Sequence, residues 1–268
     1  MPRDAARADV PPRPVLTTAA VRLTVAAMTQ RVSFSSSGGI HIGRLRGVDI
    51  QVHWLLIVLA LWQLHNYIGL ADGDTRRGVI FWLMEFVALF VTILLHVFGH
   101  VFAARRVGGW AQEIILWPLG GLAYCEAPHR PGPQFAVAAG GPAVNLLIFG
   151  VTLGVFELLP ENLVGEALGT LRFTLVHWNL VLLVFNVLPV YPLDGGRMFQ
   201  ALVWGILARR RTLGAYGRSV AATVWAARIT AGAGVLLVVT DRFALPVDPV
   251  FTVIILLWCW YTTEQLRR

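Results

Sequence analysis

Residues 78–106 read GVIFWLMEFVALFVTILLHVFGHVFAARR, an apolar run long enough for a helix to cross a membrane. It contains His96 and His100, whose spacing of four residues puts both imidazoles on one helical face, one turn apart. This pair is the ligand half of the H-E-x-x-H zinc motif, but Val97 stands where the glutamate should follow the first histidine. The stretch therefore predicts a metal site in a membrane helix that lacks the general base of that motif.

The composition of the whole chain supports a membrane location. Of the 268 residues, 56% are hydrophobic and only 14% are charged, and the mean hydropathy is +0.66. Ordinary soluble domains have about 25% charged residues, so this composition predicts an integral membrane protein. All 22 basic residues are arginines, and with 15 acidic residues they give a net charge of +7. We explain it by membrane topology and expect no nucleic-acid partner.

The chain divides into a tail and a membrane domain. Residues 1–45 are rich in Arg, Pro and Ser and predict a flexible tail, in which Met28 is an alternative start. Residues 46–268 form the predicted membrane domain. It holds six apolar stretches, at about 51–70, 78–106, 135–157, 171–190, 226–242 and 247–263. The amphipathic stretch 195–225 is expected at the membrane interface before the fifth span.

The arginines predict the orientation of these spans. With the N-terminus inside, 18 of the 22 arginines lie in inner segments. We therefore expect both termini, and the inner end of the second span with its histidines, to face the cytoplasm of a bacterial-type cell. Residues 113–123, EIILWPLGGLA, are too short and too interrupted by Pro and Gly to form a span. They predict a small β-hairpin or re-entrant element beside the site. The predicted fold class is all-α, with about six transmembrane helices and this small β element.

A zinc site usually needs three protein ligands. The third candidate is Asp194, which follows the fourth span on the same side of the membrane as the two histidines. Gly195 and Gly196 are expected to allow a sharp turn that aims its carboxylate. Asn145 falls in the inner half of the third span, where it is a candidate oxyanion donor or other support for the site.

Five motifs in order resemble the site-2 protease family of intramembrane zinc metalloproteases, of the bacterial sporulation-factor type. They are Val52-His53-Trp54, His96-x-x-Gly99-His100, Pro118-Leu119-Gly120-Gly121-Leu122-Ala123, Gly141-Pro142-x-x-Asn145, and Asn186-x-x-Pro189 followed by Leu193-Asp194-Gly195-Gly196-Arg197. The resemblance covers residues 42–265. It implies one zinc ion bound by His96, His100 and Asp194. It also implies that Asn186 and Pro189 help to hold substrate, and that the partners are single-span membrane proteins in the bilayer.

Val97 is the main departure from the family pattern. The glutamate takes a proton from the zinc-bound water and gives it to the leaving amine, and valine can do neither. Our leading interpretation is a family member with lost or severely reduced proteolysis that binds membrane helices. The alternatives are an active zinc metalloendopeptidase, through Glu113, Glu126 or an error in the sequence at position 97, and a small membrane transporter or metal-handling protein. The sequence leaves the substrate and the oligomeric state open.

Overall fold

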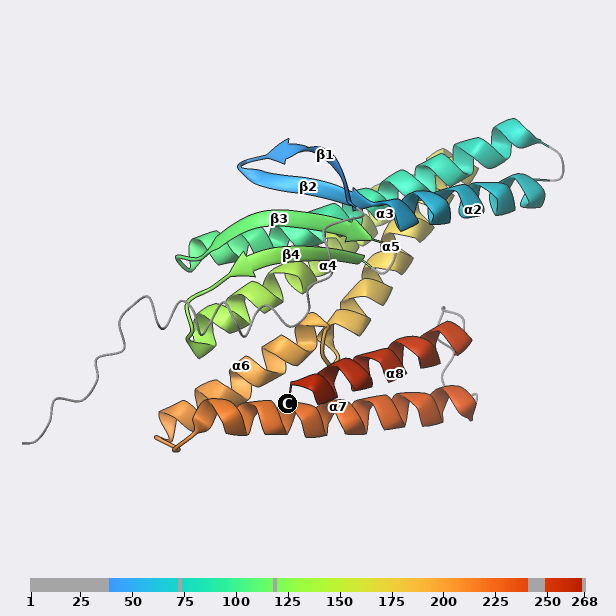
Figure 1. Ribbon diagram of the computed structural model, residues 1–268. Coiled ribbons are helices and arrows are strands. Elements are labelled where there is room, and N and C mark those ends of the chain that lie inside the picture. The colour runs from blue at the N-terminus through green and yellow to red at the C-terminus, as the bar shows by residue number, and fades with distance from the viewer. Residues whose placement is uncertain (1–38, 72–73, 118–119, 241–248, 267–268) are drawn as a thin grey trace, which may run out of the picture. The chain divides into compact units, whose positions relative to one another are not determined.

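The computed structural model describes residues 39–71, 74–117, 120–240 and 249–266. Its elements are β1 (Gly39–Leu45), β2 (Val48–His53), α2 (Trp54–Leu70), α3 (Thr75–Arg106), β3 (Trp110–Trp117), β4 (Gly120–Glu126), α4 (Pro131–Leu158), η2 (Glu161–Leu163), α5 (Glu166–Val187), α6 (Asp194–Arg209), α7 (Ala215–Val239) and α8 (Pro249–Gln265) (Figure 1). Residues 1–38, with the alternative start at Met28, lie outside the described residues. So do Pro118 and Leu119, and residues 241–248, which include the connection between the predicted fifth and sixth spans.

Four described helices, α3, α4, α5 and α7, are long and apolar enough to cross a membrane, so the chain is an integral membrane protein. They correspond to four of the six predicted spans. The other two are α2 and α8, each 17 residues long, which is the lower limit for a crossing. The fifth span differs from the prediction because α7 begins at Ala215 and not near residue 226. Gly214 adopts a left-handed φ of 66°, which ends the preceding turn, and the Ala-rich segment behind it continues as helix.

The β element is larger than the predicted hairpin. β3 and β4 form that hairpin, and β1 and β2 extend it to a four-stranded sheet in the order β1-β2-β3-β4, with β2 parallel to β3. The compact unit therefore begins at Gly39, within the segment that the sequence analysis placed in the tail. The apolar residues of VDIQV at 48–52 alternate with polar ones. This period of two is a signal for β2. It is missed in the sequence because the last of these residues also open the predicted apolar span 51–70.

A hydrophobic cluster joins this sheet to α3, the helix that carries the histidines. Its buried members are Val48, Ile50, Val97, Val101, Ala111, Ile114 and Leu116. Val97 is completely buried, at 0% exposure. The sheet is therefore packed against the same turns of α3 that present His96 and His100.

α3 and α4 approach one another closely at two glycines. A Cβ on Gly140 would lie 2.5 Å from the carbonyl oxygen of Gly99, and a Cβ on Gly99 would likewise collide with the backbone of Gly140. Small residues permit such close backbone contact between membrane helices. The crossing brings the backbone and side chains of α4 within hydrogen-bonding distance of the two imidazoles.

Candidate metal centre

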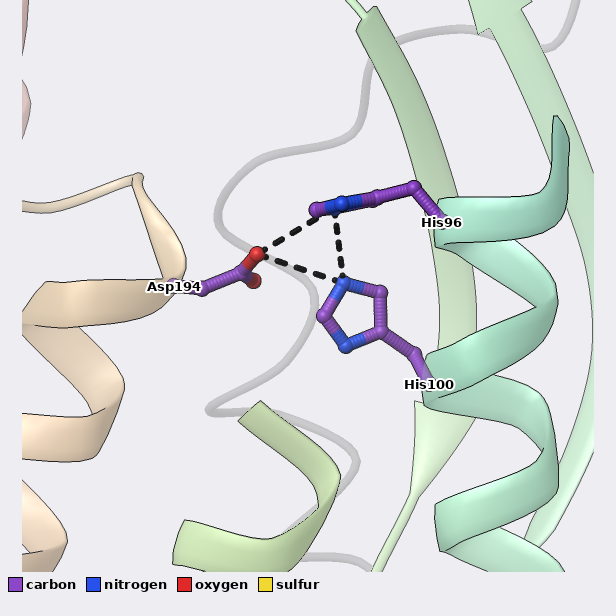
Figure 2. A group of neighbouring side chains, drawn as sticks. All are labelled: His96, His100 and Asp194. Carbon is purple, nitrogen blue, oxygen red and sulfur yellow. Dashed lines mark hydrogen bonds and ion pairs between the residues drawn. The ribbon is translucent and has the colours of Figure 1, made fainter. Parts of the chain in front are cut away.

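The three predicted ligands come together between α3 and the start of α6 (Figure 2). The Nε2 atoms of His96 and His100 are 3.1 Å apart, and each lies 3.3 Å from Oδ2 of Asp194. Both histidines are buried, at 8% exposure. Among the described residues, these three form the one group of His, Cys, Asp or Glu side chains with metal-binding geometry. The structure thus brings together residues that are up to 98 positions apart in the sequence.

Asp194 reaches the histidines because the chain before α6 folds tightly against the first turn of that helix. A Cβ on Gly195 would collide with the backbone of Val187 and Leu188, and one on Gly196 would lie 2.7 Å from the carbonyl carbon of Val190. Neither glycine has a positive φ. These glycines therefore do not supply the sharp turn that we expected from the sequence. They allow close approach of two backbone segments.

The loop before Asp194 is also anchored to α7 and α8. Val190 is completely buried against Ala227 and Cys259. The hydroxyl of Thr263 accepts a hydrogen bond from the backbone N–H of Tyr191 at 3.1 Å. The Tyr191 hydroxyl in turn donates to Gln200 of α6. Burial raises the pKa of Tyr191 to about 12, so this hydroxyl keeps its proton and remains a donor at physiological pH.

Each imidazole is oriented by a partner on α4. Nδ1 of His100 lies 2.7 Å from the carbonyl oxygen of Val137, and Nδ1 of His96 lies 2.5 Å from Oδ1 of Asn145. Both oxygens can only accept, so both Nδ1 atoms carry the proton and donate. The unprotonated Nε2 atoms then face each other and Asp194. This is the arrangement in which histidines bind metal, with the second ring nitrogen held by an outer partner.

The residues fit a metal ion on two independent observations. First, Oδ2 of Asp194 is buried with no hydrogen-bond donor, so three lone pairs converge on one point without a positive group between them. Second, a Cβ on Gly141 would lie 2.5 Å from Nε2 of His96, so this glycine keeps the space open. Two imidazoles and a carboxylate are a common donor set for zinc, and a tetrahedral ion with bonds of about 2.0–2.1 Å separates its ligand atoms by roughly 3.3 Å.

Val97 directly follows His96 on α3, and its side chain is packed in the cluster between α3 and the sheet. Its Cγ2 methyl occupies the space that a Cβ on Gly121 of β4 would need. Glu113 and Glu126, the candidate substitute bases, are placed elsewhere. Glu113 alternates with the inward-facing Ile114 and accepts a hydrogen bond from Gln51. Glu126 is exposed and pairs with Trp110 at the opposite end of β4 from Gly121.

Asn186 and Pro189, the predicted substrate-binding residues, flank the C-terminal end of α5. Asn186 lies in the last turn of that helix, and Pro189 lies in the loop that leads to Asp194. Both side chains are half-buried. Their role in holding substrate stays a prediction.

Two residues near the site were not singled out from the sequence. Thr92 of α3 and Asn179 of α5 are buried, at 2% and 0% exposure, and they extend the hydrogen bonding beyond Asn145. Their signal was a polar side chain inside an apolar span, which is expensive unless it is hydrogen-bonded. Sequence alone could not give their partners, because these lie on other helices.

Comparison with known proteins agrees with this geometry. Residues 150–231 match the family model described as peptidase family M50. Zinc metalloprotease MJ0392 of Methanocaldococcus jannaschii is 31% identical over 68% of this chain, and stage IV sporulation protein FB of Bacillus subtilis is 27% identical over 58%. The matches cover 51% and 48% of those proteins, so the chain spans about half the length of the curated relatives it matches.

A solved structure extends the agreement to the fold. The site-2 protease from Methanocaldococcus jannaschii superposes with a TM-score of 0.51, covering 86% of this chain and 95% of that one at 23% identity. At this identity the likeness concerns the fold alone. The family match, the relatives named zinc metalloprotease and the shared fold all agree. This chain therefore contains a domain of peptidase family M50, the site-2 protease family.

Proposed function

We propose that this chain binds one zinc ion through His96, His100 and Asp194 and binds membrane helices with little or no cleavage of them. When bound, zinc polarises a carbonyl oxygen and lowers the pKa of a bound water to about 7. Hydrolysis of a peptide bond also needs a group that accepts a proton from that water and delivers one to the amine. General acid–base help of this kind is worth about 10²–10⁴-fold in rate.

The observation that carries the proposal is the position of Val97. This valine directly follows the first ligand and is completely buried among apolar side chains. Its side chain has no lone pair and no exchangeable proton. Glu113 is engaged with Gln51 on the other face of the sheet, which argues against it as a substitute base. The zinc-binding residues and the position of the general base are therefore separate in this chain. Only the zinc-binding residues have side chains suited to their task.

The proposed partners are single-span membrane proteins, held next to the metal centre with help from Asn186 and Pro189. We also propose that both termini and the metal centre face the cytoplasm. By the spans predicted from the sequence, 18 of the 22 arginines lie in inner segments. The ion pair between Arg77 and Glu166 supports one part of this topology, because it places the first turns of α3 and α5 at the same membrane face.

The test has two measurements on the purified full-length chain. Zinc content after dialysis is expected near one ion per chain, and near zero in the His96→Ala variant. Cleavage of a tagged single-span reporter, chosen because an active family member cuts it, is expected to stay at background for the native chain. Zinc at background in the native chain would overturn the metal assignment. Cleavage comparable to that of the active relative would overturn the loss of proteolysis.

A further inference from the structure

A hydrogen-bonded chain of buried polar side chains, here called the file, runs from the metal centre into the packed region between α3, α4 and α5. Oδ1 of Asn145 lies 2.5 Å from Nδ1 of His96, and Nδ2 of Asn145 donates to Oδ1 of Asn179 at 3.3 Å. Nδ2 of Asn179 donates to the carbonyl oxygen of Leu175 at 2.7 Å and to the hydroxyl of Thr92 at 3.4 Å. Asn145 and Asn179 are both completely buried.

The direction of these hydrogen bonds is fixed at their far end. The carbonyl oxygen of Leu175 can only accept, so the amide nitrogen of Asn179 must face it and Oδ1 must point toward Asn145. That oxygen also only accepts, so Asn145 must present its nitrogen to Asn179 and its oxygen to His96. His96 then has to donate from Nδ1, which leaves Nε2 unprotonated and directed at the metal centre.

We propose that Asn179 and Thr92 are positioning residues for the metal centre, which act through Asn145 to hold His96 in the Nδ1–H tautomer. The inference rests on the proposed function in taking zinc as the ligand. Without the anchor on α5, the Asn145 amide is free to rotate by half a turn and place its nitrogen against the ring. His96 would then accept at Nδ1 and carry its proton on Nε2, where zinc has to bind.

His100 provides an internal comparison. Its Nδ1 bonds directly to the backbone carbonyl of Val137, which cannot rotate in this way, so His100 needs no relay. Changes at Asn179 or Thr92 should therefore disturb His96 and leave His100 unaffected. Loss of such outer partners typically lowers metal affinity by about 10–100-fold.

The experiment uses the full-length chain and four variants. Asn179→Leu removes the anchor, and Thr92→Val removes one of its two acceptors while keeping the shape of the side chain. Thr92→Ser is the conservative variant that keeps the hydroxyl. Trp178→Phe is the matched control, since it breaks the hydrogen bond from Trp178 to Glu85, which also joins α5 to α3 but lies outside the file.

Two properties are measured on each protein. Zinc affinity is obtained by competition with a chromogenic chelator. The tautomers are read from nitrogen NMR shifts of metal-free protein labelled at histidine, with His96→Ala used to assign the His96 signals. We expect Asn179→Leu to lower zinc affinity by about 10–100-fold and to shift His96 away from the Nδ1–H form while His100 keeps it. Thr92→Val should show the same changes to a lesser degree, and Thr92→Ser and Trp178→Phe should match the native protein.

Native affinity with an unchanged His96 tautomer in both Asn179→Leu and Thr92→Val would overturn the relay. An equal loss in Trp178→Phe would also overturn it, because general helix packing would then explain the effect. If Asn179→Leu does not fold, Thr92→Val and Thr92→Ser alone decide the question. Failure of the native chain to bind zinc would contradict the proposed function separately, because the tautomers are measured without metal.

Discussion

Replacing Val97 by glutamate tests the separation between the metal cradle and the missing base. The native side chain is completely buried among apolar neighbours such as Ile114 and Leu116. Losing one valine methyl from this packing costs about 0.8 kcal/mol, and burying a polar group without a partner costs about 1–3 kcal/mol. We therefore expect Val97→Glu to destabilise the metal-free protein by roughly 2–4 kcal/mol. With zinc bound, a water on the metal gives the carboxylate a partner, and the loss should be smaller.

The expected gain is catalytic. A glutamate at this position supplies both proton transfers, so Val97→Glu should cleave the single-span reporter about 10²–10⁴-fold faster than the native chain. The matched control is Val97→Gln, which has nearly the same shape and packing cost but no basic carboxylate. The double variant Val97→Glu with His96→Ala tests whether any gained cleavage depends on the metal. Cleavage rates, zinc content and thermal stability are measured on all four proteins in the same detergent.

Two results would contradict this reasoning. If the native chain cleaves within about tenfold of Val97→Glu, then Val97 does not remove an essential base, since the missing base should cost at least about 100-fold. If Val97→Glu binds zinc yet is as inactive as Val97→Gln on a reporter that an active relative cuts, then position 97 does not reach the metal-bound water. Equal thermal stability of the native and Val97→Glu proteins without metal would refute the packing argument alone.

Four further outcomes follow from the structure. Gly141→Ala places a methyl group against both imidazoles and should lower zinc affinity by about 5–150-fold, through overpacking of about 1–3 kcal/mol, as measured by chelator competition. Gly150→Ala on the same helix meets nothing within 4 Å and should leave zinc affinity unchanged. Thr263→Val removes the hydroxyl that anchors the loop before Asp194 and should lower stability by about 1–3 kcal/mol, as measured in a thermal melt. The hydroxyl of Thr262 bonds within its own helix, so Thr262→Val should change stability little. Zinc at 100 times its dissociation constant should stabilise the native chain by about 2.7 kcal/mol, and a chelator should abolish this in the native chain and have no effect on His100→Ala. Burial raises the pKa of the Cys125 thiol to about 11, so its thiolate is scarce at neutral pH. Alkylation of Cys125 should therefore be slow at pH 7.5 and should accelerate about tenfold per pH unit below pH 11, with Cys125→Ser as the blank.

The grouping of His96, His100 and Asp194 could be predicted from the sequence because each of them lies in a local pattern. His96 and His100 share one helical face by spacing alone, and Asp194 follows an apolar span that ends on the same side. The sheet was only half predicted. β3 and β4 form a local hairpin, whereas β2 pairs in parallel with a strand some 60 residues away, for which no turn residue gives a signal.

The partners of the ligands were not predictable for a related reason. Asn145 was expected from its position to support the site, and the structure gives its amide two side-chain partners, on α3 and α5. With both ends of that amide engaged, the supporting role is favoured over donation to an oxyanion. Thr92 and Asn179 carry no spacing pattern of their own. Only the packing of three helices shows that they belong to one hydrogen-bonded chain of polar residues.

A metal-binding group beside an apolar position 97 is physically consistent, because metal binding and proton transfer depend on different contacts. In the proposed site, zinc would be held by the two Nε2 atoms and the Asp194 carboxylate, in the space left by Gly141. None of these residues is a member of the apolar cluster in which Val97 is packed. A bound ion would link α3 to the loop before α6, which is joined to α7 and α8 through Val190 and Thr263. Metal binding would therefore stabilise the packing of α3 against this loop even when no proton transfer follows, which is the combination that the proposed binding role requires.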